Sequence, residues 1–441
     1  MKFLHTSDWH LGMSFRGNLS YEADQKYAIN HICEIAEAEQ VDGILIAGDV
    51  FDRSIASSEA IQMYDEIINH ICCELKIPVF VIAGNHDGAK RLAQHKELLR
   101  NSGLYVAGEL TREPQVVNSD ELRENYVNHA TLISETASAS ETASTSETTS
   151  AKKTDDVDIY MLPWISTEKV RAVFADKLGT RDNTPSTGEQ TATPGTIEAA
   201  SATQNTLSTL ESAYQLVLNE YRSRFVPGHK NILIAHAFVT GANTSVSDYA
   251  AVVGNATMIG AQVFEGFDYV ALGHLHGPQS INENIRYSGT PMAYSFGSEE
   301  AQEKSVTIID TSDMSQKIIP IRQRRKRTTL KGTYDVLMKA DYPQEVLDGY
   351  VRLEVTDCYV GMDSIALFRE KYKNLIEISS KGFDRADEKI TMTIDEFEQA
   401  DKDPKTIFTR YCEDILEEKP SEHMMNLFDN ALDKYVKESI I

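Results

Sequence analysis

Residues 2–10 read KFLHTSDWH, an apolar run of strand-forming residues that ends in a cluster of polar side chains. The same arrangement recurs at residues 43–52 (GILIAGDVFD) and at residues 79–87 (VFVIAGNHD). It recurs twice more, at residues 231–236 (NILIAH) and 268–276 (DYVALGHLH). Each apolar run is short and bounded by turn residues, as expected of a buried strand. Five predicted strands therefore end in residues that can carry chemistry.

Helical patterns separate the first three of these strands. Residues 23–38 and 58–74 repeat apolar positions at a spacing that predicts amphipathic helices. Strands that alternate with helices favour right-handed crossovers and a largely parallel α/β sheet. Because the carboxyl ends of the strands form the ligand crevice of such a sheet, we expect the five polar clusters to converge there. Further along, we expect helices at 206–221 and 258–264, and strands at 285–288 and 304–310.

The polar clusters offer carboxylates, one carboxamide and several imidazoles, but no thiolate. The residues concerned are Asp8, His10, Asp49, Asn85, His86, His236, His274 and His276. This donor set suits Mn²⁺, and also Fe²⁺ or Zn²⁺, better than Ca²⁺ or an iron–sulfur cluster. Side chains two residues apart in an extended chain point the same way, so two pairs could each present two ligands to one region: Asp8 with His10, and His274 with His276.

A single cluster of this kind is more typical of a turn than of an active site, because Asn and Asp in loops often bond only to the backbone. Five clusters at five predicted strand ends are hard to explain as turns. Two metal ions held by such residues can clamp the attacking and leaving oxygens of a phosphoester. The pattern therefore predicts a two-metal phosphoesterase.

The bulk properties set limits on this prediction. The chain has 441 residues, which is long for one compact core, so we expect two or more domains. Its net charge of −24 argues against a nucleic acid partner, but the acidic residues gather at 384–438 and a basic run at 322–327 stands apart from them. Five cysteines without metal spacing, no signal-peptide pattern and no apolar run of membrane-spanning length predict a cytoplasmic protein without a membrane segment.

Two stretches, residues 134–154 and 179–205, are dominated by small and polar residues. They cannot bury enough apolar surface to offset their ordering entropy, so we interpret them as disordered insertions into one domain that spans residues 1–315. A small α+β module is expected at 320–400, and a helical segment at 405–441.

Within the last segment, residues 421–437 predict an amphipathic helix that contains Met, Leu and Phe. Such a helix either packs against its own domain or docks into a groove of a partner, and adaptable Met side chains suit the second role. The basic residues leave a similar choice. Arg324 and Arg325 belong either to a solvated linker or to a DNA contact, whereas Lys90 and Arg91 lie closer to the predicted site.

The order of the clusters is that of a known superfamily. Asp-x-His, Gly-Asp-x-x-Asp, Gly-Asn-His-Asp, a lone His and Gly-His-x-His resemble the calcineurin-like metallophosphoesterases. The sequence segments at and near these clusters resemble those of the SbcD nucleases of the Mre-eleven-like family. These segments are HTSDWHLG at 5–12, LPW at 162–164, AHA at 235–237 and YSGTPM at 287–292. The resemblance covers residues 1 to about 310, apart from the two insertions.

The resemblance implies a four-layer α/β/β/α sandwich with a small α+β capping domain and a C-terminal helical tail. It also implies a Mn²⁺-dependent DNA nuclease, with double-strand 3′–5′ exonuclease and single-strand endonuclease activity, in DNA repair, recombination, replication and hairpin processing. Such nucleases work with an SbcC-type coiled-coil ATPase, as a homodimer within a heterotetramer. No Gly-rich phosphate-binding loop occurs in this chain, so any ATP dependence would come from that partner.

The family's residue roles can be carried over to matching positions. One metal ion would be held by Asp8, His10 and His276, and the other by Asn85, His236 and His274, with Asp49 bridging them. His86 would be the catalytic histidine, and Asp87 would orient it. Some relatives carry a histidine where this chain has Asp52, so Asp52 is assigned no catalytic part.

Two other functions compete with a nuclease. A small-molecule phosphodiesterase or phosphatase of the same fold would use the same ligands, but it would need neither residues 320–441 nor a partner helix. A non-catalytic scaffold would be expected to have lost several ligands, and all seven are present. We rank the nuclease first.

Overall fold

The computed structural model describes residues 1–15, 19–124, 156–178, 207, 209–243 and 258–380, with short pieces at 408–409, 420–421, 424–425 and 427–429. The insertions expected at 134–154 and 179–205 lie outside the described residues, as does most of the helix expected at 421–437. The chain divides into two compact units, Met1–Lys326 and Arg327–Ile441. Among the described residues, no helix is both long enough and apolar enough to cross a bilayer.

The described residues of the first unit form two six-stranded sheets. In the first sheet, β1, β4, β5 and β6 run parallel, while β15 and β16 continue it as antiparallel strands beyond β1. In order across the sheet, the strands are β16 (Ser315–Pro320), β15 (Ser305–Asp310), β1 (Lys2–Thr6), β4 (Gly43–Ile46), β5 (Val79–Ile82) and β6 (Leu104–Ala107).

The second sheet has four parallel strands between two antiparallel edges. Its order is β13 (Gln279–Ser280), β14 (Ile285–Tyr287), β12 (Tyr269–Gly273), β9 (Lys230–His236), β8 (Val157–Leu162) and β7 (Val116–Asn118). The largely parallel sheet expected from the sequence is thus two mixed sheets, because β15 pairs antiparallel with β1 and β16, and because β13 and β7 add antiparallel edges to the second sheet.

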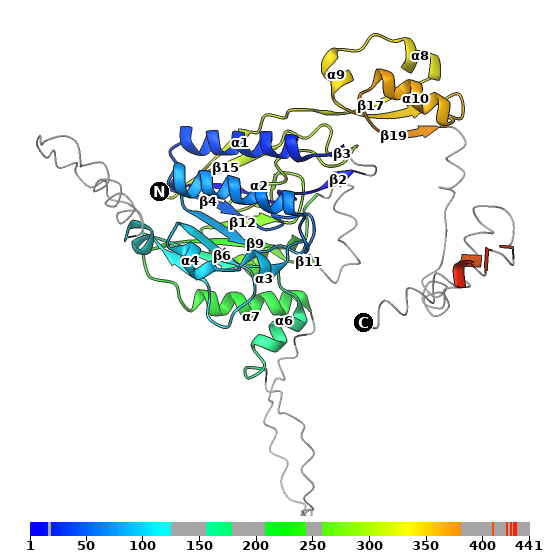
Figure 1. Cartoon of the computed structure of the whole chain (residues 1–441). Helices are drawn as coiled ribbons and strands as arrows, with labels where there is room; N and C mark the ends of the chain where they lie inside the picture. Colours follow the sequence, from blue (N-terminus) through cyan, green and yellow to red (C-terminus); the bar gives the residue numbers. More distant parts are fainter. Residues whose placement is uncertain are drawn as a thin grey trace, which may run out of the picture. The chain divides into compact units, whose positions relative to one another are not determined.

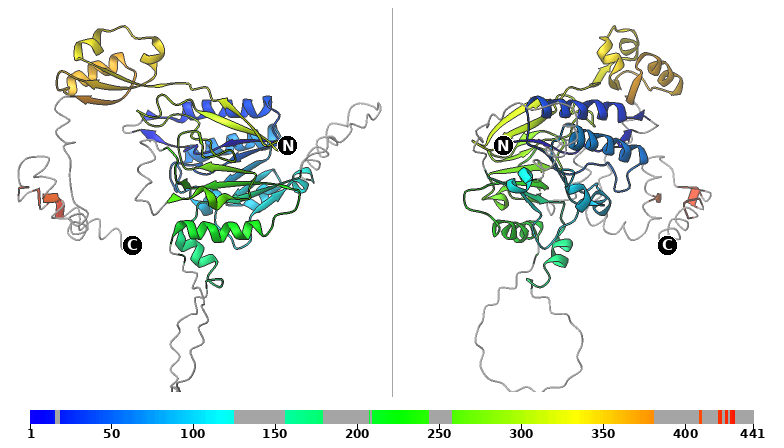
Figure 2. Two further views of the ribbon diagram at one scale, coloured as in Figure 1. Left: turned by 180° about the vertical axis from the view of Figure 1, so that it is seen from behind. Right: turned by 60° about the vertical axis from the view of Figure 1, so that its left-hand side comes forward.

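Alternating side chains stack the two sheets and their helices into four layers. In β4, Ile44 and Ile46 pack under the helices, while Leu45 packs between the sheets. In β9, Ile234 packs between the sheets and Leu233 packs against the other helices. Helices α1 (Glu22–Ala38) and α2 (Ser58–Asn69) lie on one side, and α6 (Thr167–Val173) and α7 (Leu210–Arg222) lie on the other (Figures 1 and 2). The expected four-layer α/β/β/α sandwich is confirmed.

Shorter elements connect these layers. Helices α3 (Ala89–Leu92) and α4 (Lys96–Arg100) follow β5. Two small strand pairs occur, β2 (Ser14–Phe15) with β3 (Leu19–Ser20), and β10 (Phe238–Val239) with β11 (Met258–Ile259).

Two expected helices differ from the structure. The helix expected at 258–264 is wrong in its first part, since β11 pairs with β10 before the 3₁₀ turn η4 (Ala261–Phe264) begins. The helix expected at 58–74 continues beyond α2 as a π-helical turn, η1 (His70–Glu74).

The second unit contains a parallel three-stranded sheet, β17 (Arg327–Gly332), β18 (Tyr350–Val355) and β19 (Asn374–Ser380). Helices α8 (Tyr334–Lys339), α9 (Gln344–Asp348) and α10 (Met362–Lys371) accompany it. Its core includes Leu337, Leu353 and Phe368, all with 0% exposure. The strands run parallel and alternate with helices, so this module, which begins at Arg327, is α/β rather than the α+β module expected, and β16 before it belongs to the first unit. Its role as a capping domain stays a prediction.

Candidate metal centre

The polar clusters lie at the carboxyl ends of strands from both sheets. Asp8 and His10 follow β1, Asp49 follows β4, and Asn85 and His86 follow β5. From the other sheet, His236 ends β9, while His274 and His276 follow β12. Ligand atoms lie within 4.8 Å of one another in three overlapping groups: Asp8–His10–Asp49, Asp49–His236–His274 and His10–Asp52–His86.

The backbone is strained at the residues that supply these atoms. Asp8 (φ 52°), His10 (φ 45°), Asp49 (φ 49°) and His274 (φ 103°) all adopt positive φ, which is uncommon for residues other than glycine. Such strain persists only where the surrounding structure fixes it, and it concentrates at functional sites. The sequence predicts that Asp8 and His10 lie close because side chains two residues apart in an extended chain point the same way. That reason is wrong, since the chain is not extended at either residue. They meet because the chain turns sharply at both residues.

One half of the site centres on the carboxamide of Asn85. Its Oδ1 lies 2.9 Å from His236 Nε2 and 2.9 Å from His274 Nδ1. His236 Nε2 also lies 3.2 Å from Asp49 Oδ2. On the other side of its ring, His236 Nδ1 donates to the carbonyl of Ala47 at 2.8 Å. Four of the predicted ligands thus converge on one small volume.

The other half contains Asp8, His10 and His276. The Asp8 carboxylate accepts the backbone N–H of His274, at 2.9 Å and 3.2 Å to its two oxygens. The rings of His10 and His276 lie 5.1 Å apart between centroids. His276 is not a member of the three tight groups, although its side chain is adjacent to them.

Two glycines make this convergence possible. A Cβ atom at Gly48 would lie 2.4 Å from His236 Nδ1, and one at Gly84 would lie 2.1 Å from Asp49 Oδ1. Neither position has room for a side chain. The glycines of the Gly-Asp and Gly-Asn motifs therefore serve the packing of the ligands as well as the turns.

Burial and mutual charge set the protonation of the site. Burial lowers the pKa of His10 and that of His274 to about 3, so both rings are neutral near pH 7, which is the form that binds metal. Burial opposes a charged His236, but the Asp49 carboxylate outweighs burial and raises the pKa of His236 to about 9. Burial also opposes ionisation of Asp49, yet His236 holds the pKa of that carboxyl well below its usual range.

Two observations indicate that the site fits a cation. His236 Nδ1–H is committed to the Ala47 carbonyl, so Nε2, which faces two oxygens, must hold either a second proton or a cation. His10 is 2% exposed, and neither of its ring nitrogens has a hydrogen-bond partner among the described residues. Buried polar atoms normally have partners, so this ring is suited to a ligand role.

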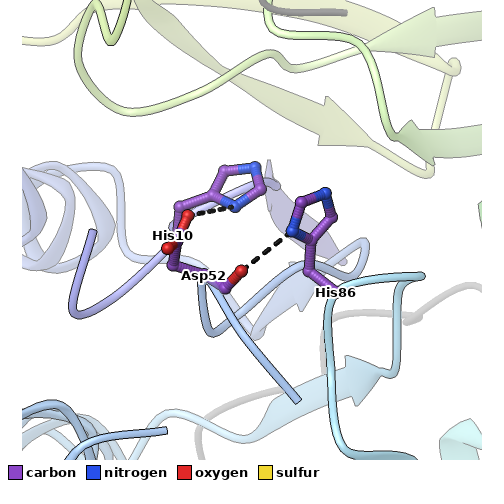
Figure 3. A group of neighbouring side chains, drawn as sticks. All are labelled: His10, Asp52 and His86. Atoms are coloured by element: carbon purple, nitrogen blue, oxygen red, sulfur yellow. Dashed lines mark hydrogen bonds and ion pairs between the residues drawn. The ribbon is translucent and has the colours of Figure 1, made fainter. Parts of the chain in front are cut away.

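Figure 3 shows His86 beside Asp52 and His10. The ring of His86 is half-buried, and Nδ1 donates to the backbone carbonyl of Asp52 at 2.9 Å. Its backbone N–H donates to Asp49 Oδ1 at 2.8 Å. The Asp52 side chain points toward His10, with Oδ1 at 3.9 Å from Nδ1. The hydrogen bond to the Asp52 carbonyl thus uses Nδ1 of His86 and not Nε2.

Asp87 has different partners from those expected of it. Its carboxylate accepts three backbone N–H groups, from Val50 (3.2 Å), Phe51 (2.9 Å) and Gly84 (2.8 Å). It therefore joins the loops after β4 and β5. His86 is instead oriented by the hydrogen bond that its Nδ1–H donates to the Asp52 carbonyl. The sequence does not predict this contact, because every residue has a main-chain oxygen whatever its side chain.

Other contacts around the ligands were also missed. Trp164 stacks on His274, with ring centroids 5.4 Å apart, and the LPW motif was the one signal that could have pointed to it. Gln25 donates to the carbonyl of His10 at 2.7 Å and to the hydroxyl of Tyr294 at 2.9 Å. Glu299 Oε1 lies 3.5 Å from His276 Nδ1.

The four predicted DNA-contact residues lie in different surroundings. Lys90 and Arg91 are exposed on α3, directly after the Gly-Asn-His-Asp cluster. Arg324 and Arg325 instead reach Asp24 of α1, at 3.4 Å and 2.7 Å from its Oδ2. Asp24 is 2% exposed, so the basic run is anchored by a buried carboxylate.

Comparison with known proteins agrees with this geometry. A relative from Staphylococcus epidermidis, the SbcD subunit of the SbcCD nuclease, is 28% identical over 391 residues, which are 88% of this chain and 87% of that protein. The family model for calcineurin-like phosphoesterases matches residues 1–278. Because that match covers more than half of the chain, the chain belongs to the calcineurin-like phosphoesterase family, whose members hydrolyse phosphoesters with divalent metal ions.

Proposed function

We propose that this chain is a Mn²⁺-dependent DNA nuclease with double-strand 3′–5′ exonuclease and single-strand endonuclease activity. The observation that carries the proposal is the convergence of acidic, amide and imidazole donors at the ends of β1, β4, β5, β9 and β12. The similarity to a nuclease subunit, which extends through both units of the chain, favours DNA over a small substrate.

Two sets of ligands share one carboxylate in this proposal. Asp8, His10 and His276 would hold one ion, Asn85, His236 and His274 would hold the other, and Asp49 would bridge them. When bound, the ions would activate a water molecule and neutralise the charge of the phosphodiester. Oxygen and imidazole donors without thiolate suit Mn²⁺.

His86 supplies the proton chemistry. Its Nδ1 proton is held by the Asp52 carbonyl, so Nε2 is the atom that reaches a phosphoryl oxygen or the leaving oxygen. In the imidazolium form, Nε2–H stabilises the charge that develops in the transition state or protonates the leaving group. The exposed Lys90 and Arg91 would bind the neighbouring phosphates of the DNA backbone.

We also propose an SbcC-type coiled-coil ATPase as the partner, in a heterotetramer that contains two copies of this chain. The helix expected at 421–437 would dock on that partner. The complex would process hairpins and DNA ends in repair, recombination and replication.

A nuclease assay tests the proposal. The full chain, loaded with Mn²⁺, is incubated with end-labelled hairpin and linear duplex DNA, with and without an SbcC-type ATPase. Bis(p-nitrophenyl) phosphate serves as the small phosphodiester. Cutting of DNA supports the proposal. Rapid hydrolysis of the small phosphodiester without any DNA cutting would favour the small-molecule phosphodiesterase, and failure to bind metal or to hydrolyse either substrate would favour a scaffold.

A further inference from the structure

A buried ion pair lies behind His276. Glu299 and Lys304 are each 1% exposed, and Lys304 Nζ lies 2.9 Å from Glu299 Oε2. The other carboxylate oxygen, Oε1, lies 3.5 Å from His276 Nδ1. Lys304 Nζ also donates to the backbone carbonyl of His276 at 2.9 Å. The three residues thus form a closed ring of contacts that starts at the His276 imidazole and ends at the His276 carbonyl.

The carboxylate of Glu299 is fixed by more than this lysine. Oε2 accepts the backbone N–H of Tyr294 at 3.1 Å, and Oε1 accepts the hydroxyl of Ser295 at 2.5 Å. The carbonyl of His276 also accepts the backbone N–H of Thr290 at 3.2 Å. Both ends of the ring are therefore rigid.

A buried ion pair is weak evidence for stability, because desolvation of the two charges offsets much of their attraction. Its position next to one ring nitrogen of a predicted ligand suggests another role. A carboxylate that accepts the Nδ1–H of a histidine fixes the tautomer, leaves the Nε2 lone pair for a metal ion, and makes the imidazole a stronger ligand. Lys304 holds the carboxylate in place.

We propose that Glu299, held by Lys304, is the positioning residue of His276: its carboxylate faces Nδ1, favours the tautomer that is protonated there, and so leaves Nε2 for the cation that His276 shares with Asp8 and His10. The inference rests on the proposed metal centre, since His276 is a ligand only there. It predicts that the pair controls one of the two metal affinities and leaves the other intact.

The experiment measures Mn²⁺ binding to the full chain by the electron paramagnetic resonance of free Mn²⁺, without any nuclease assay. The variants are Glu299→Gln and the double variant Glu299→Gln/Lys304→Met, which leaves no unpaired buried charge. In both, one Mn²⁺ affinity should fall about 10–100-fold, and the other should stay at its wild-type value.

Asp158→Asn is the matched control. Asp158 is 3% exposed and lies 3.1 Å from His229 Nδ1, so it is another buried carboxylate beside a histidine, at a pair that contains none of the predicted ligands. It should lose thermal stability and keep both affinities.

Unchanged affinities in a folded Glu299→Gln/Lys304→Met protein would overturn the inference, and so would an equal loss of affinity in Asp158→Asn. If the wild type bound two Mn²⁺ ions but cut no DNA, the nuclease proposal would fail, while the affinity comparison would still decide the role of Glu299.

Discussion

The two sheets of the first unit bring different chemistry to the site. The strands β1, β4 and β5 are followed by both predicted carboxylate ligands, the carboxamide and two imidazoles (His10 and His86), whereas β9 and β12 lead to imidazoles alone. Contacts between the sheets join the two sets, since the His274 N–H donates to Asp8 and His236 Nε2 lies against Asn85 and Asp49. Each of the two proposed ligand sets therefore combines residues from both sheets. The packing of one sheet on the other is thus what builds the site.

His86 follows a strand of the first sheet, like several predicted ligands, but we assign it no cation. Its substitution therefore tests most directly which residues of that sheet bind metal. We expect His86→Ala to retain both Mn²⁺ ions and to lose about 10²–10⁴-fold in the rate of DNA cleavage, the usual contribution of a general acid. Metal analysis and single-turnover cleavage check the two parts. An apo protein would contradict the role, since it would make His86 a ligand.

Asp52→Ala is the control for that variant. The substitution removes a carboxylate that lies 3.9 Å from His10 Nδ1, but it keeps the carbonyl that accepts the His86 proton. We expect cleavage to stay within a few-fold of the wild type. A loss as large as that of His86→Ala would show that the Asp52 side chain, rather than its carbonyl, acts in the site.

Removal of metal tests whether a bound cation links the two sheets. A ligand that binds only the folded state stabilises it by about 2.7 kcal/mol when present at 100 times its Kd. We therefore expect Mn²⁺ at that excess to raise the Tm, and a chelator to reverse the change. Calorimetry of the full chain checks this. The same Tm with Mn²⁺ and with chelator would mean that no cation links the two sheets.

The comparison also explains what the sequence could predict. The ends of β1, β4, β5, β9 and β12 were placed correctly because apolar runs and turn residues are local signals. The antiparallel return of β15 to β1, and the pairing of β10 with β11, depend on contacts between distant segments and were missed. The closeness of Asp8 to His10 was expected, but the positive φ that produces it was not. The contacts of Glu299 with His276 and of the Asp52 carbonyl with His86 could not be predicted from the sequence, because they join residues that only the fold brings together.

A smaller effect is expected from substitutions in two groups of basic residues, which test which part of the first unit binds DNA. For each DNA phosphate that the protein no longer neutralises, the slope of log K against log salt becomes shallower by about 0.9. We expect the double variant Lys90→Ala/Arg91→Ala to change the slope by the equivalent of one or two phosphates. Arg324→Ala/Arg325→Ala should change it less, because Asp24 already neutralises part of this charge. Fluorescence anisotropy over a series of salt concentrations measures both, and the reverse order would place DNA on the basic run.

The smallest effect concerns a second link between the sheets, at His5. This histidine of β1 is 0% exposed, and its Nε2–H donates to the carbonyl of Leu272 at 3.1 Å while Nδ1 accepts the hydroxyl of Tyr269 at 3.0 Å. Both nitrogens are satisfied only in the neutral ring. Burial, aided by the charge of Arg286, lowers the pKa of His5 to about 3.

The folded state therefore resists a proton that the unfolded state accepts near pH 6.5. The stability that His5 contributes is complete well above pH 6.5 and is lost as the pH falls from there toward 3. Between pH 7 and pH 6 the loss amounts to about 0.7 kcal/mol. In His5→Gln this part of the pH dependence should vanish, while other titrating groups act equally in both proteins. Urea unfolding at the two pH values measures the difference, and parallel changes in the two proteins would show that the link between the sheets at His5 tolerates a charge.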